Sequence, residues 1–476
     1  MRFLTTSTTL LSLSGVIGLA NIPGVYGWGA AGHEIVATIA QIYLHPAVLA
    51  DVCSILYPGS NANSSSNEPP CYISKVATWA DQVRRSPQYR YTGVLHYIGA
   101  KDDHPSSTCA FPGSSGWAGK TNENVLGAIR NMSSILDGYI YGVVENNRAE
   151  EALKFLVHFL GDMHQPLHLT GRERGGNGVK VTFDGRLTNL HSLWDGYLIA
   201  KALRTIPKNY SQPLSSIGSP VDVESHLFGA IYDPYIRRIM HEGFGIGLSD
   251  ASTSGRFASE YQDWLSCPEQ PSPSFYQSLA VFIRNIRSLL QSFAGPLGGG
   301  RHISEAVSSL VDMIIKFGKP RSSQRRVGND EGRWDNEVLC PYAWAKDLHK
   351  LNCEFPLWPR ELDQGGSHEA FAAIEEEDED EEHTRDHLDA ENEVLEAWLQ
   401  QQRAETLNAA QRPPSPHPDL LELDTPEYAG RISEEWLVER LVAMAGIRLA
   451  GLLNALFLPP DLLPHTSPTL PVISLW

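Results

Sequence analysis

The strongest signal in this chain is the stretch Leu156-Val157-His158-Phe159-Leu160-Gly161-Asp162-Met163-His164-Gln165-Pro166-Leu167-His168, followed by Gly175-Gly176-Asn177 and His191-Ser192-Leu193-Trp194-Asp195. His158 and Asp162 are four residues apart in an apolar run without proline, so a helix would place them on one face. His191 and Asp195 repeat this offset. His168 follows a proline, where a helix kinks or ends, and can therefore approach either pair. Neutral imidazoles together with carboxylates suit zinc, which keeps one position for water in catalytic sites.

A single His-x-x-x-Asp pair is more often a surface or N-cap pair than a metal site. Two such pairs with a third histidine, set among Leu, Phe and Trp, are harder to explain in that way. Buried polar groups cost free energy unless they are paired, and this region would bury several. The stretch therefore predicts a metal cage.

Length and charge limit the classes of protein to which this chain can belong. The chain has 476 residues and a formal net charge of -18. It is long enough for a large core, with two or three domains as the starting expectation. The acidic balance disfavours a protein that grips duplex phosphates through a basic surface, but it does not exclude an enzyme whose cations are metal ions.

The first 27 residues read as a signal peptide. Arg2 precedes an apolar Ser/Thr/Leu-rich segment, and Val25-Tyr26-Gly27 has the small-x-small pattern of a cleavage site before Trp28. A first core helix is the alternative, but Pro23 and the glycines disfavour it. We expect a secreted, extracellular protein. We expect no membrane association, because we find no later apolar run of about 18 residues or more.

Cysteines and sequons fit the same compartment. Six cysteines in a secreted chain suggest three disulfides, although composition alone does not choose among fifteen pairings. Asn63, Asn131 and Asn209 begin N-glycosylation sequons, and Asn63 lies in a Ser/Asn-rich loop.

Trp28 would carry a free amine after cleavage behind Gly27. That amine and the Trp28 carbonyl oxygen can close a five-membered chelate on a metal, with His33 as a nearby third ligand. Further along, Asp81 precedes an arginine by three residues in an expected helix, and His96 lies in a short apolar run. Alone, His96 would more often be a core or surface histidine than a ligand.

Taken together, the motifs resemble the S1/P1 nuclease family. They are, in order, Trp-Gly-x-x-Gly-His, Trp-Ala-Asp-x-x-Arg, Leu-His-Tyr, His-Phe-x-Gly-Asp-x-x-Gln-Pro-Leu-His, Gly-Gly-Asn and Asn-Leu-His-x-x-Trp-Asp. The resemblance implies a mainly α-helical fold, phospholipase C/P1 nuclease-like, around a trinuclear zinc cluster.

The resemblance also implies roles for single residues. The first zinc site would be Asp81, His96, His158 and Asp162; the second His168, His191 and Asp195; the third Trp28, His33 and Asp162. Asp162 would bridge two metals, Arg84 would face the scissile phosphate, and Asn177 would lie in the substrate cleft.

The implied reaction is endonucleolytic hydrolysis of single-stranded DNA and RNA to 5'-phosphate products. A hydroxide bridging the first and third zinc ions would attack phosphorus in line, the second zinc would stabilise the departing 3'-oxygen, and Arg84 would hold a non-bridging oxygen. The sequence leaves 3'-nucleotidase activity open. We expect a monomer without a protein partner.

Tyr97 is placed to stack a base. Two positions depart from the family pattern. Gly99 stands where an aspartate often follows the aromatic residue, and Arg174 stands where a small apolar residue can complete the clamp. Base preference is therefore open.

The nuclease domain would run from 28 to 457, with a C-terminal tail at 458–476. Two inserts would interrupt it: 268–337, helical or mobile, and 364–425, acidic and disordered, with eight consecutive acids from Glu375 to Glu382. Cys109 and Cys353 resemble the family's long-range bridge. Cys53 and Cys71 flank the Ser/Asn loop, and Cys267 and Cys340 would close the first insert at its base.

Two other functions stay open. A zinc phospholipase C would share the metal cage and would be favoured by an amphipathic entrance, whereas Arg84 and the Gly-Gly-Asn loop favour a nuclease. A secreted zinc-binding protein without catalysis would keep the ligands but would not need the arginine.

Overall fold

The computed structural model describes residues 28–58, 71–112, 114–215, 221–248, 254–267, 334–336, 339–355, 357–363 and 420–458. Over these ranges the chain is mainly α-helical, as expected. The helices are α1 (Ala30–Ile42), α2 (Pro46–Leu56), α3 (Trp79–Val83), α4 (Val125–Ile140), α5 (Asn146–Asp162), α6 (Glu173–Gly176), α7 (Leu190–Ser192), α8 (Leu198–Thr205), α9 (Asp233–Arg238), α13 (Pro341–Glu354), α16 (Arg431–Glu434) and α17 (Leu437–Phe457). Short 3-10 segments include η2 (Arg90–His96) and η3 (Pro166–Leu169), and π-helical turns occur at η4 (Leu193–Tyr197), η7 (Ile239–Gly243) and η10 (Pro426–Gly430).

Helices α1 and α17 form the centre of the core. They come from opposite ends of the described chain and pack against each other. The crossing is close at Gly446, where an added Cβ would lie 2.6 Å from Ile39 Cγ2 and 3.0 Å from the Val36 carbonyl oxygen. A larger residue at 446 would therefore push the two helices apart.

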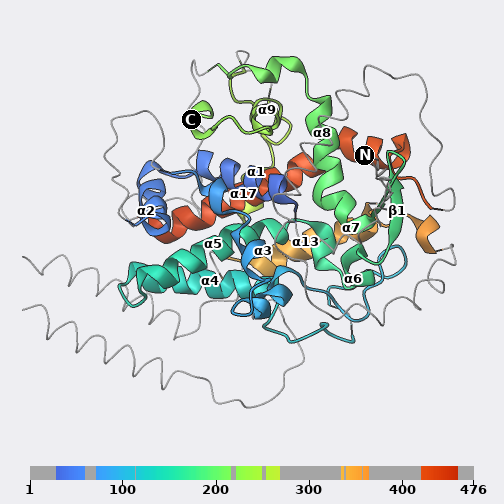
Figure 1. Cartoon of the computed structure of the whole chain (residues 1–476), viewed down its shortest axis with the longest axis horizontal. Coiled ribbons are helices and arrows are strands. Elements are labelled where there is room, and N and C mark those ends of the chain that lie inside the picture. The colour runs from blue at the N-terminus through green and yellow to red at the C-terminus, as the bar shows by residue number, and fades with distance from the viewer. Residues whose placement is uncertain are drawn as a thin grey trace, which may run out of the picture.

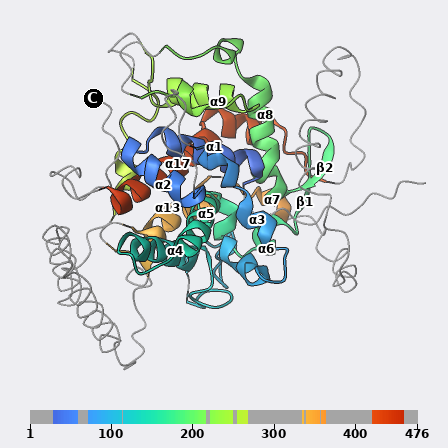
Figure 2. The ribbon, with the colours of Figure 1, turned by 60° about the vertical axis from the view of Figure 1, so that its left-hand side comes forward.

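Helices α4 and α5 pack together on one side of this pair, and α8 and α9 lie on the other (Figures 1 and 2). Helix α5 also contacts α1, α2, α3 and α17, and α13 packs on η3. This position explains the composition of α5, in which every residue from Phe155 to Asp162 is buried. A segment so enclosed can hold charged groups only in pairs or on a metal.

One two-stranded antiparallel sheet appears among the described residues. Strands β1 (Lys180–Phe183) and β2 (Arg186–Asn189) pair in the register Val181 with Thr188, and lead into α7 and η4. Residues 420–425, which close the second predicted insert, add a parallel bridge from Glu422 to Thr182. The hairpin thus lies between the substrate-loop motif and the second His/Asp pair.

The predicted inserts lie almost entirely outside the described residues, as do the predicted signal peptide and the tail beyond Leu458. At the end of the first insert, Trp334 is buried at 2% exposure, and its carbonyl oxygen accepts a hydrogen bond from Arg130. Asp335 accepts hydrogen bonds from the backbone of Tyr342 and Ala343 at the start of α13. Residues 334–336 therefore pack with the helical core.

Three disulfides join Cys53 to Cys71, Cys109 to Cys353 and Cys267 to Cys340. These are the pairs proposed from the sequence.

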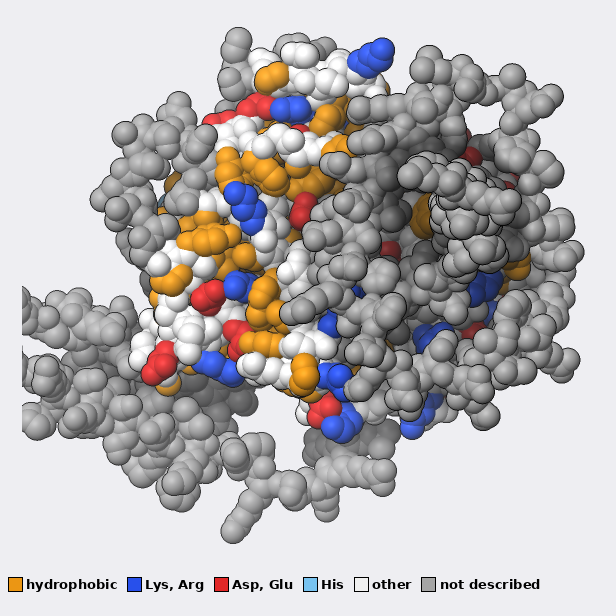
Figure 3. Space-filling model, viewed as in Figure 1, with side chains coloured by type: hydrophobic (Ala, Val, Ile, Leu, Met, Phe, Trp, Pro, Cys, Tyr) orange, Lys and Arg blue, Asp and Glu red, His pale blue; other side chains and the backbone are white. Residues whose placement is uncertain are grey.

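The sequence analysis overlooked one long apolar segment. Helix α17 has 21 residues and is long and apolar enough to cross a membrane, but 78% of its most apolar window is buried inside the protein. Its partners α1, α4 and α5 cover it, so it is a core helix. On the face in Figure 3, outside the grey atoms, acidic and basic side chains are interspersed with apolar ones.

Candidate metal centre

Helix α5 supplies the central pair of the site. His158 and Asp162 are both fully buried, and His158 Nε2 lies 3.3 Å from Asp162 Oδ2. Three further histidines approach the same carboxylate: His33 Nε2 at 3.4 Å, His96 Nδ1 at 2.9 Å and His168 Nδ1 at 3.6 Å. The i, i+4 spacing in an unbroken helix is what places His158 over Asp162.

The ligand-type atoms gather in three groups, each within 4.8 Å: His33, His158 and Asp162; Asp81, His96 and His158; and His168, His191 and Asp195. All the side chains predicted as ligands are present in them. The sequence assigned His158 to the first zinc site alone, whereas His158 belongs to two of the three groups. Its ring stacks on that of His33, with the ring centroids 3.7 Å apart.

The second pair is built differently from the first. His191 belongs to α7, whereas Asp195 lies in the π-helical turn η4, yet His191 Nε2 is 3.3 Å from Asp195 Oδ2. His168 follows α5 in η3, where Pro166 starts a new turn, and its Nε2 lies 3.2 Å from His191 Nε2. The break at the proline thus brings His168 to the second pair.

Backbone carbonyl groups orient the ring nitrogens. The Nδ1–H groups of His158, His168 and His191 donate to the carbonyl oxygens of Ala77 (2.7 Å), His96 (2.8 Å) and Gly175 (2.7 Å). Each bond leaves Nε2 with its lone pair facing the centre, because an acceptor on Nδ1–H fixes the tautomer and the orientation of a histidine ligand.

Gln165 is a residue whose role the sequence analysis missed. It is fully buried, and its Nε2 donates to Asp195 Oδ1 at 2.8 Å while its Oε1 accepts from Leu167 N at 2.6 Å. Its place immediately before a helix-starting proline is a signal that could have identified it as an N-cap.

The pKa values are those of groups prepared for a cation. Burial, with repulsion from His158, lowers the pKa of His33 to about 4, and burial with His168 lowers that of His191 to about 3. Burial also lowers the pKa of His158, but Asp162 and Asp81 outweigh it and raise the value to about 9. The two carboxylates thus favour a positive charge at the position of His158.

Unsatisfied polar atoms test whether a metal fits. His33 Nδ1 and Nε2, His158 Nε2 and Asp162 Oδ1 are buried and have no hydrogen-bond partner. Buried polar atoms are nearly always satisfied in folded proteins. The donor set of imidazole and carboxylate is that of zinc, so the residues fit this ion.

The Trp28 side chain is fully buried beside this centre. The next residue, Gly29, donates its N–H to the Asp195 carbonyl oxygen at 2.9 Å, and the Gly29 carbonyl oxygen accepts from His33 N at 3.2 Å. The start of the described chain is thereby fixed between two predicted ligands.

Arg84 lies at the edge of the centre, with its side chain 12% exposed and its Nε 3.3 Å from Asp81 Oδ1. Tyr97 is 41% exposed. Asn177 is buried, and its Nδ2 donates to the Arg174 carbonyl oxygen at 2.8 Å.

Gly99 has a steric explanation. An added Cβ there would lie 2.5 Å from the Gly171 backbone nitrogen, so no larger residue fits beside this loop. Arg174 N donates to the Gly171 carbonyl oxygen at 3.3 Å, which places Arg174 one turn from the same contact. The two departures from the family pattern are therefore neighbours.

Of the sequons, Asn131 on α4 and Asn209 are exposed, and Asn63 lies outside the described residues.

Fold and site together define a mainly α-helical protein built around a candidate multinuclear metal centre. The family model described as S1/P1 Nuclease matches residues 28–223. Endonuclease 1 of Arabidopsis thaliana is 32% identical over 231 residues, which are 48% of this chain and 70% of that protein. The chain belongs to the S1/P1 nuclease family.

Two fungal relatives are more similar over shorter stretches. Nuclease S1 of Aspergillus oryzae is 39% identical over 171 residues, or 36% of this chain and 54% of the relative. Nuclease P1 of Penicillium citrinum is 37% identical over 181 residues, or 37% of this chain and 60% of the relative. The chain thus covers less than two thirds of the length of these two proteins.

Proposed function

We propose that this protein is a secreted, monomeric, zinc-dependent endonuclease that hydrolyses single-stranded DNA and RNA to 5'-phosphate products. The observation that carries the proposal is the set of three His/Asp groups with Arg84 at their edge. His158 belongs to two of the groups, and Asp162 of one group lies 3.6 Å from His168 of another. The fungal relatives named as nucleases support the same activity.

Zinc would be held by the three groups, with the Trp28 amine and carbonyl oxygen completing the set around His33 if the leader is removed. The chemistry that zinc supplies when bound is Lewis-acid polarisation of a phosphate and a lower pKa of water. The low pKa values of His33 and His191 keep these ligands neutral, and therefore able to bind a metal, in mildly acidic solution.

Arg84 would bind the scissile phosphate. Its ion pair with Asp81 fixes the guanidinium, which can donate two hydrogen bonds to non-bridging phosphate oxygens. The exposed ring of Tyr97 would stack on a base, which requires that base to be separated from its neighbours. A single strand meets this requirement at lower cost than a duplex does.

The test is one zinc-loaded preparation assayed on four substrates: single-stranded DNA, the matching duplex, RNA and phosphatidylcholine. We expect cleavage of both single strands, with 5'-phosphates identified by mass spectrometry. Arg84→Ala should lower kcat/KM by about 100-fold or more, because a donor to the transition state is lost.

The matched control is Arg148→Ala. Arg148 also pairs with an acid three residues away, Glu151, at 3.2 Å, but its side chain is 62% exposed on α5 and touches no predicted ligand. Turnover should be unchanged in this variant. Hydrolysis of phosphatidylcholine without cleavage of either single strand would instead identify a phospholipase.

A further inference from the structure

The loop between η3 and β1 contains α6, which is a left-handed turn and not an ordinary helix. Four consecutive residues have left-handed φ angles: Glu173 at 47°, Arg174 at 56°, Gly175 at 67° and Gly176 at 89°. Glycine adopts this region freely, but Glu173 and Arg174 carry side chains that disfavour it. The loop therefore needs contacts from outside to hold its shape.

The shape of this loop affects the metal centre directly. The Gly175 carbonyl oxygen accepts the hydrogen bond from His191 Nδ1 at 2.7 Å, and an added Cβ at Gly175 would lie 3.3 Å from the same nitrogen. A rotation of the Gly175 peptide would release the His191 ring. The same turn carries Arg174 and Asn177 at the proposed substrate cleft.

Arg172, the residue before the four, is anchored on three sides. Its side chain is 5% exposed, and its guanidinium donates to the Pro105 carbonyl oxygen at 2.5 Å, to Ser106 Oγ at 3.0 Å and to Asp363 Oδ1. It also stacks on the Trp358 ring at 4.5 Å. Ser106 Oγ donates to the other Asp363 oxygen at 2.5 Å, so the arginine and the carboxylate share a hydroxyl group.

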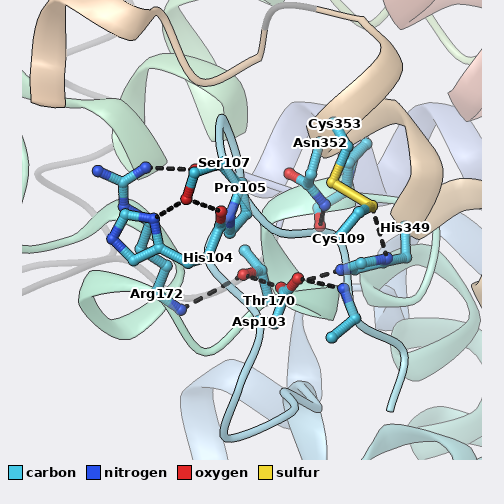
Figure 4. Close-up of a disulfide and its surroundings, with 12 residues drawn as sticks. Asp103, His104, Pro105, Ser107, Cys109, Thr170, Arg172, His349, Asn352 and Cys353 are labelled. Carbon is cyan, nitrogen blue, oxygen red and sulfur yellow. Dashed lines mark hydrogen bonds and ion pairs between the residues drawn. A yellow bond between two sulfur atoms is a disulfide. The ribbon is translucent and has the colours of Figure 1, made fainter. Parts of the chain in front are cut away.

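A second anchor holds the residue two positions earlier (Figure 4). Thr170 Oγ1 donates to Asp103 Oδ2 at 2.5 Å, and His349 Nε2 donates to the same oxygen at 2.9 Å. His349 is on α13, beside the disulfide from Cys109 to Cys353. The base of the loop is thereby tied to α13.

We propose that Arg172, through its clamp to Asp363 and Trp358, is a positioning residue that holds the left-handed turn so that the Gly175 carbonyl group orients His191. This proposal rests on the proposed function for its consequence in catalysis. Asp363 and Trp358 lie beyond residues 28–223, so the clamp joins the part of the chain matched by the family model to a part that it does not match.

The test compares Arg172→Met with Arg238→Met. Methionine keeps the apolar contact and removes the donors. Arg238 is a matched control, because it stacks on Trp436 at 4.5 Å and pairs with Glu242 at 3.3 Å, with its side chain 18% exposed, and it belongs to α9 rather than to the loop. Three quantities are measured: hydrogen exchange of a peptide spanning residues 171–179, the chelator concentration that removes each zinc, and KM against kcat.

In Arg172→Met we expect faster exchange in that peptide, loss of one zinc at a roughly 10- to 100-fold lower chelator concentration, and a rise in KM, since outer-shell changes typically have effects of this size. Arg238→Met should leave exchange, zinc retention and KM unchanged, and its only expected effect is a lower melting temperature. A double-mutant cycle with Asp363→Asn should be non-additive, because both changes break one clamp. Arg172→Lys should restore little, as an ammonium group does not reproduce the fork of donors or the stacking.

Equal exchange, zinc retention and KM in Arg172→Met and Arg238→Met would overturn the proposal, even if both variants were less stable. A wild-type chain that binds no zinc or cleaves no single strand would overturn the proposed function instead. The exchange measurement would still decide whether Arg172 holds the turn.

Discussion

Gly161 in helix α5 offers a sharp test of the metal centre. It lies between His158 and Asp162, and a Cβ added there would lie 2.7 Å from His33 Nδ1 and 3.1 Å from His33 Cε1. Glycine to alanine inside a helix ordinarily stabilises a protein by about 1 kcal/mol. Here the His33 ring occupies the space that the added methyl group needs, so we do not expect alanine to stabilise the protein.

The size of the effect follows from the contact. Ordinary van der Waals contact begins at 3.4 Å, so the His33 ring must move by about 0.7 Å to admit the methyl group at 2.7 Å. Overpacking of this kind costs about 1–3 kcal/mol, which leaves the metal-free variant between unchanged and about 2 kcal/mol less stable. A metal ligand tolerates a shift of only about 0.2 Å, so the site that uses His33 should lose its ion.

The assay measures zinc per chain by competition with a chelator, and the free energy of unfolding of the metal-free protein in urea. Gly161→Ala should retain the zinc held by His168, His191 and Asp195 and lose the one beside His33. Gly196→Ala is the control: Gly196 is also helical and adjacent to a predicted ligand, but an added Cβ would meet nothing within 4 Å. It should be stabilised and should keep all its zinc. If Gly161→Ala behaved in the same way, His33 would not occupy the position described.

Three further predictions follow from the same centre. Chelation of zinc should abolish cleavage of single-stranded DNA and lower the melting temperature, because the clustered ligands would lose the cations that offset their charge; undiminished cleavage by a verified metal-free sample would show the mechanism to be wrong. One extra alanine before Trp28 should remove the zinc beside His33 and reduce turnover, whereas equal zinc content and rate in the processed and extended chains would show that the amine is not a ligand. The metal-free protein should be most stable near pH 6.5. The pKa values of His33 and His191 are about 4 and about 3 in the folded protein, so the unfolded chain takes up these two protons at a higher pH. Each histidine therefore lowers the free energy of unfolding by about 1.4 kcal/mol per pH unit as the pH falls below 6.5. Protonated His158, with a pKa of about 9, stabilises the folded protein, and this stabilisation is lost as the pH rises from 6.5 toward 9. The measurement is the free energy of unfolding in urea between pH 5 and 9. A steady rise over this range would contradict the prediction.

The sequence predicted which candidate ligands lie close together, because the spacing within each pair is a local property. A period of 3.6 places His158 over Asp162 wherever the helix forms, and a proline predicts the turn at which His168 leaves it. His191 and Asp195 lie close together for a less direct reason. A π-helical turn carries Asp195, yet the offset of four still brings it to His191.

Contacts between distant segments could not be predicted in this way. The hydrogen bond from Arg172 to Asp363 joins residues that share no motif, and neither Glu173 nor Arg174 has a composition that indicates a left-handed turn. The close approach of Gly99 to Gly171 is likewise a property of the folded chain. Each of these depends on tertiary packing, which overrides local preference.

The pairing of α1 with α17 also affects how the chain folds during its synthesis. A ribosome adds about 5–20 residues per second, so roughly 20 to 80 s separate the synthesis of these two helices. During that interval the apolar face of α1, with Val36 and Ile39, lacks the partner that buries it. A nascent chain of this protein therefore exposes that face until α17 has emerged.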